Sequence, residues 1–234
     1  MSDNKKQTCL YWNIRSNKIN TIEKIFDMAE PDIIFLSEVE NPDGKKVNPY
    51  LRGKGYECLK WVGDCSYKGL ALYAKPGTIA HCYSEGDGQY SIAAHIVDKD
   101  ACVIGVWTKP PAYKYCKQMQ EIFDYYTSKE NHPIFVGDFN VSPNVCGQEK
   151  KASVLFKNLN DKGYVSLYHQ NRNINVGEEV DVTYRHTSGA CFMLDYVLIS
   201  ASCVDSVGLT TDFSNSKDLL QLGFSDHIPI IFEV

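Results

Sequence analysis

The sequence predicts an α/β or α+β fold, and three observations support this prediction. Short apolar runs rich in Ile, Val, Phe, Tyr and Leu recur along the chain, as expected of strands buried on at least one face. Segments whose apolar residues follow helical spacing lie between several of these runs. Other neighbouring runs have no clear helix between them, so we expect antiparallel pairing in places and a mixed sheet or two packed sheets.

The apolar runs give the predicted strands. In chain order they are residues 8–14, 32–38, 69–74, 101–107, 133–139, 194–200 and 228–234. The pairs without a clear intervening helix are 69–74 with 101–107, and 194–200 with 228–234. These are the pairs in which we expect antiparallel pairing.

Apolar residues recurring at intervals of three or four predict the helices. The segments are 17–29, 113–129 and 149–162. Pro31 closes the first of them, and Gly163 is a typical stop after the last. Residues 168–190 are polar, contain Asn and Gly, and are predicted to form a long surface loop, which in compact domains is often functional.

Length and composition describe an ordinary globular chain. The 234 residues can bury a full core, and we expect one domain, residues 1–234, that is monomeric. Lys and Arg are outnumbered by Asp and Glu, which gives a net charge of -5. This charge argues against a broad electrostatic grip on nucleic acid but leaves room for a local basic groove.

The cysteines and the N-terminus predict where the protein works. The cysteine count, nine, is odd, and no two cysteines have the C-x2-C spacing of a zinc or redox site. The sequence begins with the polar stretch MSDNKKQTC, and no run approaches the roughly 18 apolar residues of a membrane span. We therefore expect a cytoplasmic protein with reduced thiols and no membrane partner.

Polar side chains able to bind a metal or a phosphate lie at the ends of the predicted strands. They are Asn13, Glu38, Asp138, Asn140, Asp195, Asp226 and His227. Taken singly, each has an ordinary explanation, such as a turn, a solvated strand end or a satisfied core histidine. Taken together they indicate phosphate chemistry, because carboxylate oxygens suit Mg²⁺ or Mn²⁺ and an aspartate can orient an imidazole.

Asp138 and Asn140 are predicted to act on one substrate group. The two residues are separated by one position in the segment GDFN, and residues two apart on a strand face the same way. His227 follows Asp226 at the start of the last strand, and Asp195 is available to hold its other ring nitrogen. These are the groups needed to split a phosphate ester.

The motifs that contain these residues, in this order, resemble the endonuclease/exonuclease/phosphatase superfamily, which has the deoxyribonuclease-I-like fold. The motifs are WNIR, FLSE, GDFN, LDYVLIS and SDH, and the resemblance runs from about residue 9 to 234. It implies a four-layer α/β sandwich in which two mixed β-sheets pack face to face with helices outside, and an active site at one rim. It also implies hydrolysis of phosphate esters that depends on Mg²⁺ or Mn²⁺.

The resemblance also implies metal ligands. Glu38 is similar to the main metal ligand of the family, and Asn13 and Asp226 are similar to the residues that support it. Whether one or two metal ions act stays open at this point.

Catalytic roles follow from the same resemblance. Asp138 is similar to the group that orients or deprotonates the attacking water, and Asn140 to the amide that contacts the phosphate. His227 resembles the phosphate-binding histidine, and Asp195 resembles the carboxylate that forms a hydrogen bond with it.

One stretch departs from the family pattern. Members commonly carry a histidine or tyrosine that touches the scissile phosphate after the fourth strand, whereas the stretch GVWTKPPAYKY places Trp107 or Thr108 there. Lys109 follows, either as a charge for a phosphate oxygen or as a solvated loop lysine. We take Trp107, Lys109 and Arg185 as candidate substrate-binding residues.

A nuclease that cleaves phosphodiester bonds in nucleic acid is the first functional hypothesis. Basic residues interleaved with aromatic ones form the candidate grip: Lys109, Lys114, Lys117, Arg172 and Arg185, with Trp107, Tyr113, Tyr115 and Tyr184. The competing explanation is that many of them simply form the exposed side of the 113–129 helix. Two other functions stay open, a phosphatase or phosphodiesterase for a small phosphorylated molecule, and a binding protein without catalysis.

Overall fold

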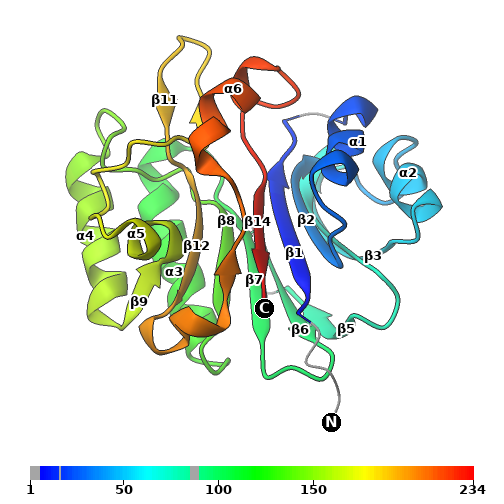
Figure 1. Ribbon diagram of the computed structural model, residues 1–234, viewed down its shortest axis with the longest axis horizontal. Coiled ribbons are helices and arrows are strands. Elements are labelled where there is room, and N and C mark those ends of the chain that lie inside the picture. Colours follow the sequence, from blue (N-terminus) through cyan, green and yellow to red (C-terminus); the bar gives the residue numbers. More distant parts are fainter. Residues whose placement is uncertain (1–5, 16, 85–89) are drawn as a thin grey trace.

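Two six-stranded sheets pack face to face with helices on their outer sides (Figure 1). This computed structural model describes residues 6–15, 17–84 and 90–234. The arrangement confirms the four-layer α/β sandwich with two mixed sheets. In the described part of the chain, no helix has the length and apolar character that crossing a bilayer requires.

The first sheet has the strand order β13-β14-β1-β2-β4-β3. Its strands are β1 (Thr8–Asn13), β2 (Ile33–Val39), β3 (Glu57–Cys65), β4 (Lys68–Ala74), β13 (Gly208–Leu209) and β14 (Ile230–Glu233). β1 runs parallel to β2 and antiparallel to β14, while β4 pairs antiparallel with both β2 and β3. The sheet is therefore mixed, and the last strand of the chain lies beside the first.

The second sheet has the strand order β5-β6-β7-β8-β12-β9. Its strands are β5 (Ile79–Tyr83), β6 (Ser91–Ile96), β7 (Cys102–Trp107), β8 (Ile134–Asp138), β9 (Tyr164–Ser166) and β12 (Asp195–Ser200). β7 and β8 are parallel, and the other neighbours are antiparallel. A small hairpin of β10 (Tyr184–Arg185) and β11 (Cys191–Phe192) stands apart from both sheets.

Helices cover the outer faces of the sandwich. They are α1 (Ile19–Met28), α2 (Val47–Gly53), α3 (Tyr115–Thr127), α4 (Glu149–Asp161), α5 (Leu167–Arg172) and α6 (Ser216–Gln221). Short 3-10 turns occur at Ala112–Lys114, Ala201–Ser206 and Phe213–Asn215. In Figure 1, α1 and α2 lie outside the first sheet, whereas α3, α4 and α5 lie outside the second.

Strand periodicity explains how each sheet buries both faces. Along β1, Cys9 and Tyr11 point into the core between the sheets, while Leu10 and Trp12 join the separate cluster beneath α1 and α2. The sheets approach closely at Gly105, where a Cβ atom would lie 2.2 Å from the ring of Phe35. The apolar runs in the sequence therefore mark strands covered on both sides.

All the predicted strands and helices exist, and antiparallel pairing occurs in both sheets as expected, but it does not join the two pairs of strands singled out in the sequence. Strands 69–74 and 101–107 belong to different sheets, as do strands 194–200 and 228–234. The elements that were not predicted are β3, β5, β6, β9, β10, β11, β13, α2, α5 and α6. β3 and β5 are edge strands with mostly half-buried or exposed residues, so their sequences lack a continuous apolar run. Two predicted strands that follow one another in the sequence can thus belong to different sheets.

The segment predicted as a loop, 168–190, is only partly one, because it holds most of α5 and the whole of β10. A buried carboxylate fastens its middle: the Glu179 side chain is 2% exposed and accepts hydrogen bonds from His169 Nε2 (2.9 Å), Gly177 N (2.9 Å) and Asn144 Nδ2 (2.7 Å). Burial alone would raise the pKa of Glu179, but the donors from His169 and Gly177 outweigh burial and lower that pKa.

Candidate active site

Strand ends bring the predicted site residues to one rim of the sandwich. Asn13 ends β1, Glu38 lies one residue before the end of the parallel β2, and Asp138 ends β8. Asp195 begins β12 and is the antiparallel partner of Asp138. His227 approaches β14 from the same end and forms an isolated bridge with Tyr184 of the β10–β11 hairpin. In Figure 1 this rim lies at the top, near the β11 label.

Four buried side chains form a continuous polar line across the rim. Asn13 Nδ2 donates to Asp138 Oδ2 at 3.0 Å, and that oxygen lies 3.7 Å from His227 Nε2. The opposite ring nitrogen, Nδ1, lies 2.8 Å from Asp195 Oδ2. Each of these residues is at most 5% exposed. The imidazole is therefore oriented between two carboxylates, of which the contact with Asp195 was expected from the sequence and the approach of Asp138 was not.

The charges of this line are strongly coupled. Burial alone would lower the pKa of His227, but the carboxylates of Asp195 and Asp138 outweigh it and raise that pKa to about 10. Burial raises the pKa of Asp138 to about 7, with Asp195 acting in the same direction and His227 opposing it. At neutral pH His227 is therefore an imidazolium that can donate from Nε2, and Asp138 has a pKa suited to a general base.

Glu38 and Asp226 flank this line, and each attracts a cationic side chain. Glu38 Oε2 lies 3.0 Å from Lys68 Nζ, and Asp226 Oδ2 lies 3.4 Å from Arg15 Nε. Asn13 Nδ2 also reaches Glu38 Oε1 at 3.5 Å, which links this carboxylate to the buried line. The side chains of Glu38 and Asp226 are 18% and 17% exposed, so both can meet a ligand from solvent.

Glu38 adopts a backbone conformation that non-glycine residues rarely use. Its φ is 60°, and the pairing of β2 with β4 changes register between Ser37 and Val39. Such a bulge redirects a side chain at the end of a strand. The unusual backbone conformation thus occurs at Glu38, a candidate metal ligand, as strained conformations often do at functional sites.

Asn140 lies beyond the end of β8, which is Asp138. The prediction that Asp138 and Asn140 share one face of a strand is therefore wrong. Its φ is 52°, its backbone N–H donates to Asp138 Oδ1 at 3.0 Å, and its Nδ2 donates to Thr108 O at 3.1 Å. Asp138 and Asn140 are therefore joined by a turn rather than by a shared strand face. Gly137 precedes them because a Cβ there would lie 1.9 Å from Val106 O of the neighbouring strand.

The predicted substrate-binding residues are not gathered at this line. Trp107 is 3% exposed, packs edge-on against Tyr90 and lies under the Nζ of Lys68, so its ring offers no open face to a base. Lys109 Nζ donates to Asp64 and to the hydroxyl of Tyr90. The charge of Lys109 is thus already matched by a carboxylate.

Arg185 lies beside the metal-ligand candidates. Its backbone N–H donates to Asp226 O at 2.8 Å, and its side chain helps to line a cavity of about 610 Å³ that also reaches Asp226. Arg15, Lys18 and His186 line the same cavity. A local basic hollow therefore adjoins the rim of a chain whose net charge is -5.

The remaining members of the predicted grip are scattered. Arg172 pairs with Asp181 and Lys117 with Glu121. Lys114 Nζ lies over the ring of neighbouring Tyr113. These residues do not extend the basic cavity.

Sequence reasoning missed several groups at the rim. Lys68 and Arg15 were not singled out, although an antiparallel β4 beside β2 would have placed its first residue, Lys68, near Glu38. Thr183 was also missed, and its Oγ1 accepts from Asp195 N at 3.0 Å. The rings of Tyr184 and His227 are 4.7 Å apart.

Tyr115 supplies an aromatic hydroxyl within the electric field of the site. Burial and then the charge of Asp138 raise the pKa of Tyr115 to about 12, with smaller effects of the same sign from Tyr184 and Glu38. It begins α3 and is the last residue of the stretch in which the sequence departs from the family pattern.

This sandwich, with its polar rim, is typical of metal-dependent phosphoester hydrolases. Residues 10–227 match the model of the Endonuclease/Exonuclease/phosphatase family, and the chain belongs to that family. Its enzymes include nucleases and phosphatases. A search of curated proteins finds no significant match.

Solved structures share the fold at low sequence identity. The 3'-5' exonuclease NExo from Neisseria meningitidis superposes with a TM-score of 0.69 at 20% identity, covering 97% of this chain and 98% of that one. An AP endonuclease from Archaeoglobus fulgidus has a TM-score of 0.69 at 17% identity, with coverage of 97% and 98%. ANGEL2, a 2',3'-cyclic phosphatase seen with adenosine-2',3'-vanadate, has a TM-score of 0.65 at 14% identity, with coverage of 97% and 95%.

Proposed function

We propose that this protein is a Mg²⁺-dependent nuclease that hydrolyses phosphodiester bonds in nucleic acid. The observation that carries the proposal is the buried line from Asn13 through Asp138 and His227 to Asp195, which Glu38 and Asp226 flank at one rim. An oriented imidazolium, a carboxylate with a raised pKa and oxygen donors for a cation are the groups that phosphoester hydrolysis requires.

The residues present fit a hard divalent cation, Mg²⁺ or Mn²⁺. Glu38 and Asp226 offer carboxylate oxygens. Each already forms an ion pair with a cationic side chain, Glu38 with Lys68 and Asp226 with Arg15. Asn13 would support Glu38 through the contact between their side chains. When bound, the cation supplies positive charge that offsets the anionic phosphoryl oxygens and stabilises the leaving oxygen.

The chain's own residues supply positioning and proton transfer. Asp138 accepts hydrogen bonds from Asn13 and Asn140 N, which fix its carboxylate so that it can orient and deprotonate a water in line with the leaving group. His227, held by Asp195, donates from Nε2 to a non-bridging phosphoryl oxygen.

Asn140 is a more indirect candidate for phosphate contact. Its Nδ2 is bound to Thr108 O, so that hydrogen bond must be exchanged before the amide nitrogen can reach a phosphate. The backbone N–H of Asn140 meanwhile restrains Asp138.

Nucleic acid is favoured as substrate by the basic cavity beside Asp226. Arg15, Lys18 and Arg185 line it, and cationic side chains next to a phosphoester site can hold the flanking phosphates of a strand. Among the neighbours in fold, the 3' phosphatase NExo from Neisseria has been seen bound to a product DNA hairpin. Lys109 and Trp107 are the weaker binding candidates, since one is paired with Asp64 and the other is buried.

A small phosphorylated molecule is the second candidate substrate. The cavity of about 610 Å³ lies within the size range of small-molecule sites, roughly 300 to 1,000 Å³. A nucleotide or an inositol phosphate could place one phosphate at the rim and the remainder in this cavity.

Salt dependence separates the two substrates. Purified protein is assayed with Mg²⁺ against single-stranded DNA, nicked and abasic duplex, RNA, inositol phosphates and bis-(p-nitrophenyl) phosphate, with chelator as the negative control. For a nucleic-acid enzyme the logarithm of affinity falls with the logarithm of salt by about 0.7 to 0.9 per phosphate contacted. Cleavage of small phosphates alone with a shallow salt slope would replace the first candidate, and no hydrolysis of any substrate would refute both.

A further inference from the structure

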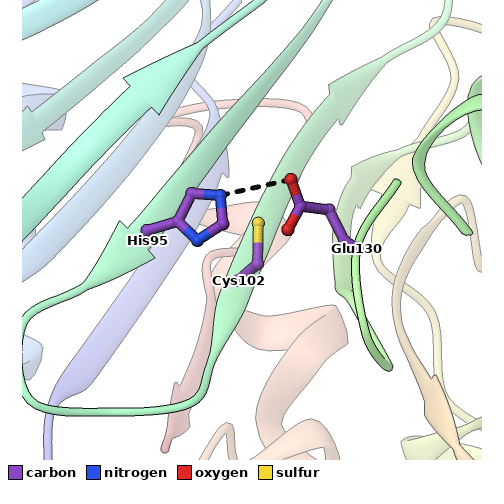
Figure 2. A group of neighbouring side chains, drawn as sticks. All are labelled: His95, Cys102 and Glu130. Carbon is purple, nitrogen blue, oxygen red and sulfur yellow. Dashed lines mark hydrogen bonds and ion pairs between the residues drawn. The ribbon is translucent and has the colours of Figure 1, made fainter.

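A second group of metal-ligating side chains lies far from the rim. His95, Cys102 and Glu130 each point one donor atom toward the others, and these atoms all lie within 4.8 Å of one another. Figure 2 shows the sulfur of Cys102 directed at the gap between the His95 ring and the Glu130 carboxylate. Cys102 and Trp107 are the two ends of β7. At about 3.3 Å per residue, the group is therefore about 16 Å along the strand from the rim.

Strand register holds these donors on one face of the sheet. Cys102 of β7 is the partner of His95 on β6, which in turn is the partner of His81 on β5. Cross-strand partners point to the same side, so His81 adds a nitrogen to this face, with ring centroids 6.0 Å from His95. His95 also shares its face with Ser91, whose hydroxyl lies 3.1 Å from that of Tyr126 on α3.

Glu130 is held over this face by its own contacts. It follows the end of α3, and its backbone N–H donates to Tyr126 O at 2.8 Å. Its Oε1 lies 3.2 Å from His95 Nε2 and accepts from the hydroxyl of Tyr83. In metalloproteins, carboxylates that ligate the metal are commonly oriented by accepting a hydrogen bond from a residue outside the ligand set. The Glu130 side chain is 13% exposed, so its charge lies in a partly dry environment.

We propose that His95, Cys102 and Glu130 form a binding site for a divalent transition metal, Zn²⁺ above all, separate from the phosphoester site. One nitrogen, one sulfur and one oxygen form a donor set that suits Zn²⁺ and not Mg²⁺. Bond lengths of about 2.0 to 2.3 Å separate tetrahedral donors by about 3.3 to 3.8 Å, so closure shortens the distance between any two ligand atoms by at most about 1.5 Å. A fourth position is left for water or His81.

The protonation of the ligands defines the binding reaction. Burial and then the charge of Glu130 raise the pKa of Cys102 to about 12, so without a metal the residue is a thiol. Forming the metal–sulfur bond breaks the S–H bond and releases that proton to solvent, while His95 binds as the neutral imidazole and Glu130 as the carboxylate. No electrons are transferred. The half-buried His95, 35% exposed at its side chain, gives the ion a way in from solvent.

The bound ion would fasten the segment after α3 to β6 and β7. Its expected effect is therefore on stability and not on the chemistry at the rim. The chain offers matched controls, because all nine cysteines are free and Cys146 is exposed.

Cobalt spectroscopy tests the site in the full-length protein with excess Mg²⁺ present. We expect one equivalent of Co²⁺ to give tetrahedral d–d bands and a sulfur-to-cobalt charge-transfer band, and Zn²⁺ to displace it. Cys102→Ala should remove the charge-transfer band, and Cys146→Ala should retain it. His95→Gln should weaken Zn²⁺ binding at least tenfold in competition with a chromophoric chelator. Zn²⁺ should raise the thermal midpoint of the parent protein but not of Cys102→Ala.

Two results would overturn the proposal. One is a parent protein that binds neither Co²⁺ nor Zn²⁺ at micromolar concentration. The other is equal binding by the parent, Cys102→Ala and His95→Gln, each shown by circular dichroism to be folded. Because the readouts are spectra and melting, they stand whatever the substrate at the rim proves to be.

Discussion

Replacing Asp138 with asparagine tests the proposed general base with little change of shape. The carboxylate accepts from Asn140 N at Oδ1 and from Asn13 Nδ2 at Oδ2, each at 3.0 Å. An asparagine can keep the first hydrogen bond, but its NH₂ would then face the NH₂ of Asn13. One buried hydrogen bond is lost, which costs about 1 to 3 kcal/mol. Loss of the attraction between Asp138 and His227 adds to that cost, and relief of the weaker repulsion between Asp138 and Asp195 offsets part of it.

Activity should fall much further than stability. Removing a general base costs about 10²- to 10⁴-fold, or about 3 to 5 kcal/mol of transition-state stabilisation. The assay is single-turnover hydrolysis of the best substrate with saturating Mg²⁺, alongside thermal unfolding. Asp124→Asn is the control, because Asp124 is half-exposed and contacts Lys162 and Gln120 at the surface, away from the rim. Near-normal turnover by a folded Asp138→Asn variant would refute the assignment.

Further predictions concern the metal, the imidazole and acid stability. Glu38→Ala should raise the Mg²⁺ concentration for half-maximal rate at least tenfold, and an unchanged titration would remove Glu38 from the metal site. Asp195→Asn should reduce turnover less than His227→Ala, because an amide oxygen can still accept from Nδ1; the reverse order would mean that Asp195 itself contacts substrate or metal. Glu179→Gln should lower the free energy of unfolding by about 2 kcal/mol at pH 7. Because folding lowers the pKa of Glu179, this carboxylate stabilises the folded protein above its unfolded pKa of about 4.3. That stabilisation is lost as the pH falls through the folded pKa. The denaturation curves of parent and variant should therefore converge in acid. A difference that persists in acid, or one equally large for the exposed Glu149→Gln, would contradict this.

The sequence predicted the buried strands well because their apolar runs are continuous. β1, β2, β7 and β8 are buried along nearly their whole length, and such runs are distinctive. It did not predict the partners, because a run buried on both faces does not show which sheet it joins. β4 and β7, which we expected to pair, thus lie in the two facing sheets.

The site residues were predictable where strand ends carry them, and less so elsewhere. Asp195 and His227 are brought together by a buried contact 32 residues apart in sequence, as the motif order indicated. Lys68 and Arg15 became visible only with the fold, because their importance depends on which carboxylate they face. The burial of Trp107 could not be foreseen either, since an aromatic residue at the end of a strand can point toward the core or toward solvent.

The contact between Asn13 and Asp138 joins the two sheets, since one residue ends β1 and the other ends β8. Neither sheet alone therefore holds all the proposed catalytic side chains, and under this proposal we expect turnover to depend on how the two sheets are aligned. A displacement of about 1 Å between reacting groups can cost about 10²-fold in rate. We therefore expect substitutions deep between the layers, such as at Gly105 against Phe35, to change turnover as well as stability.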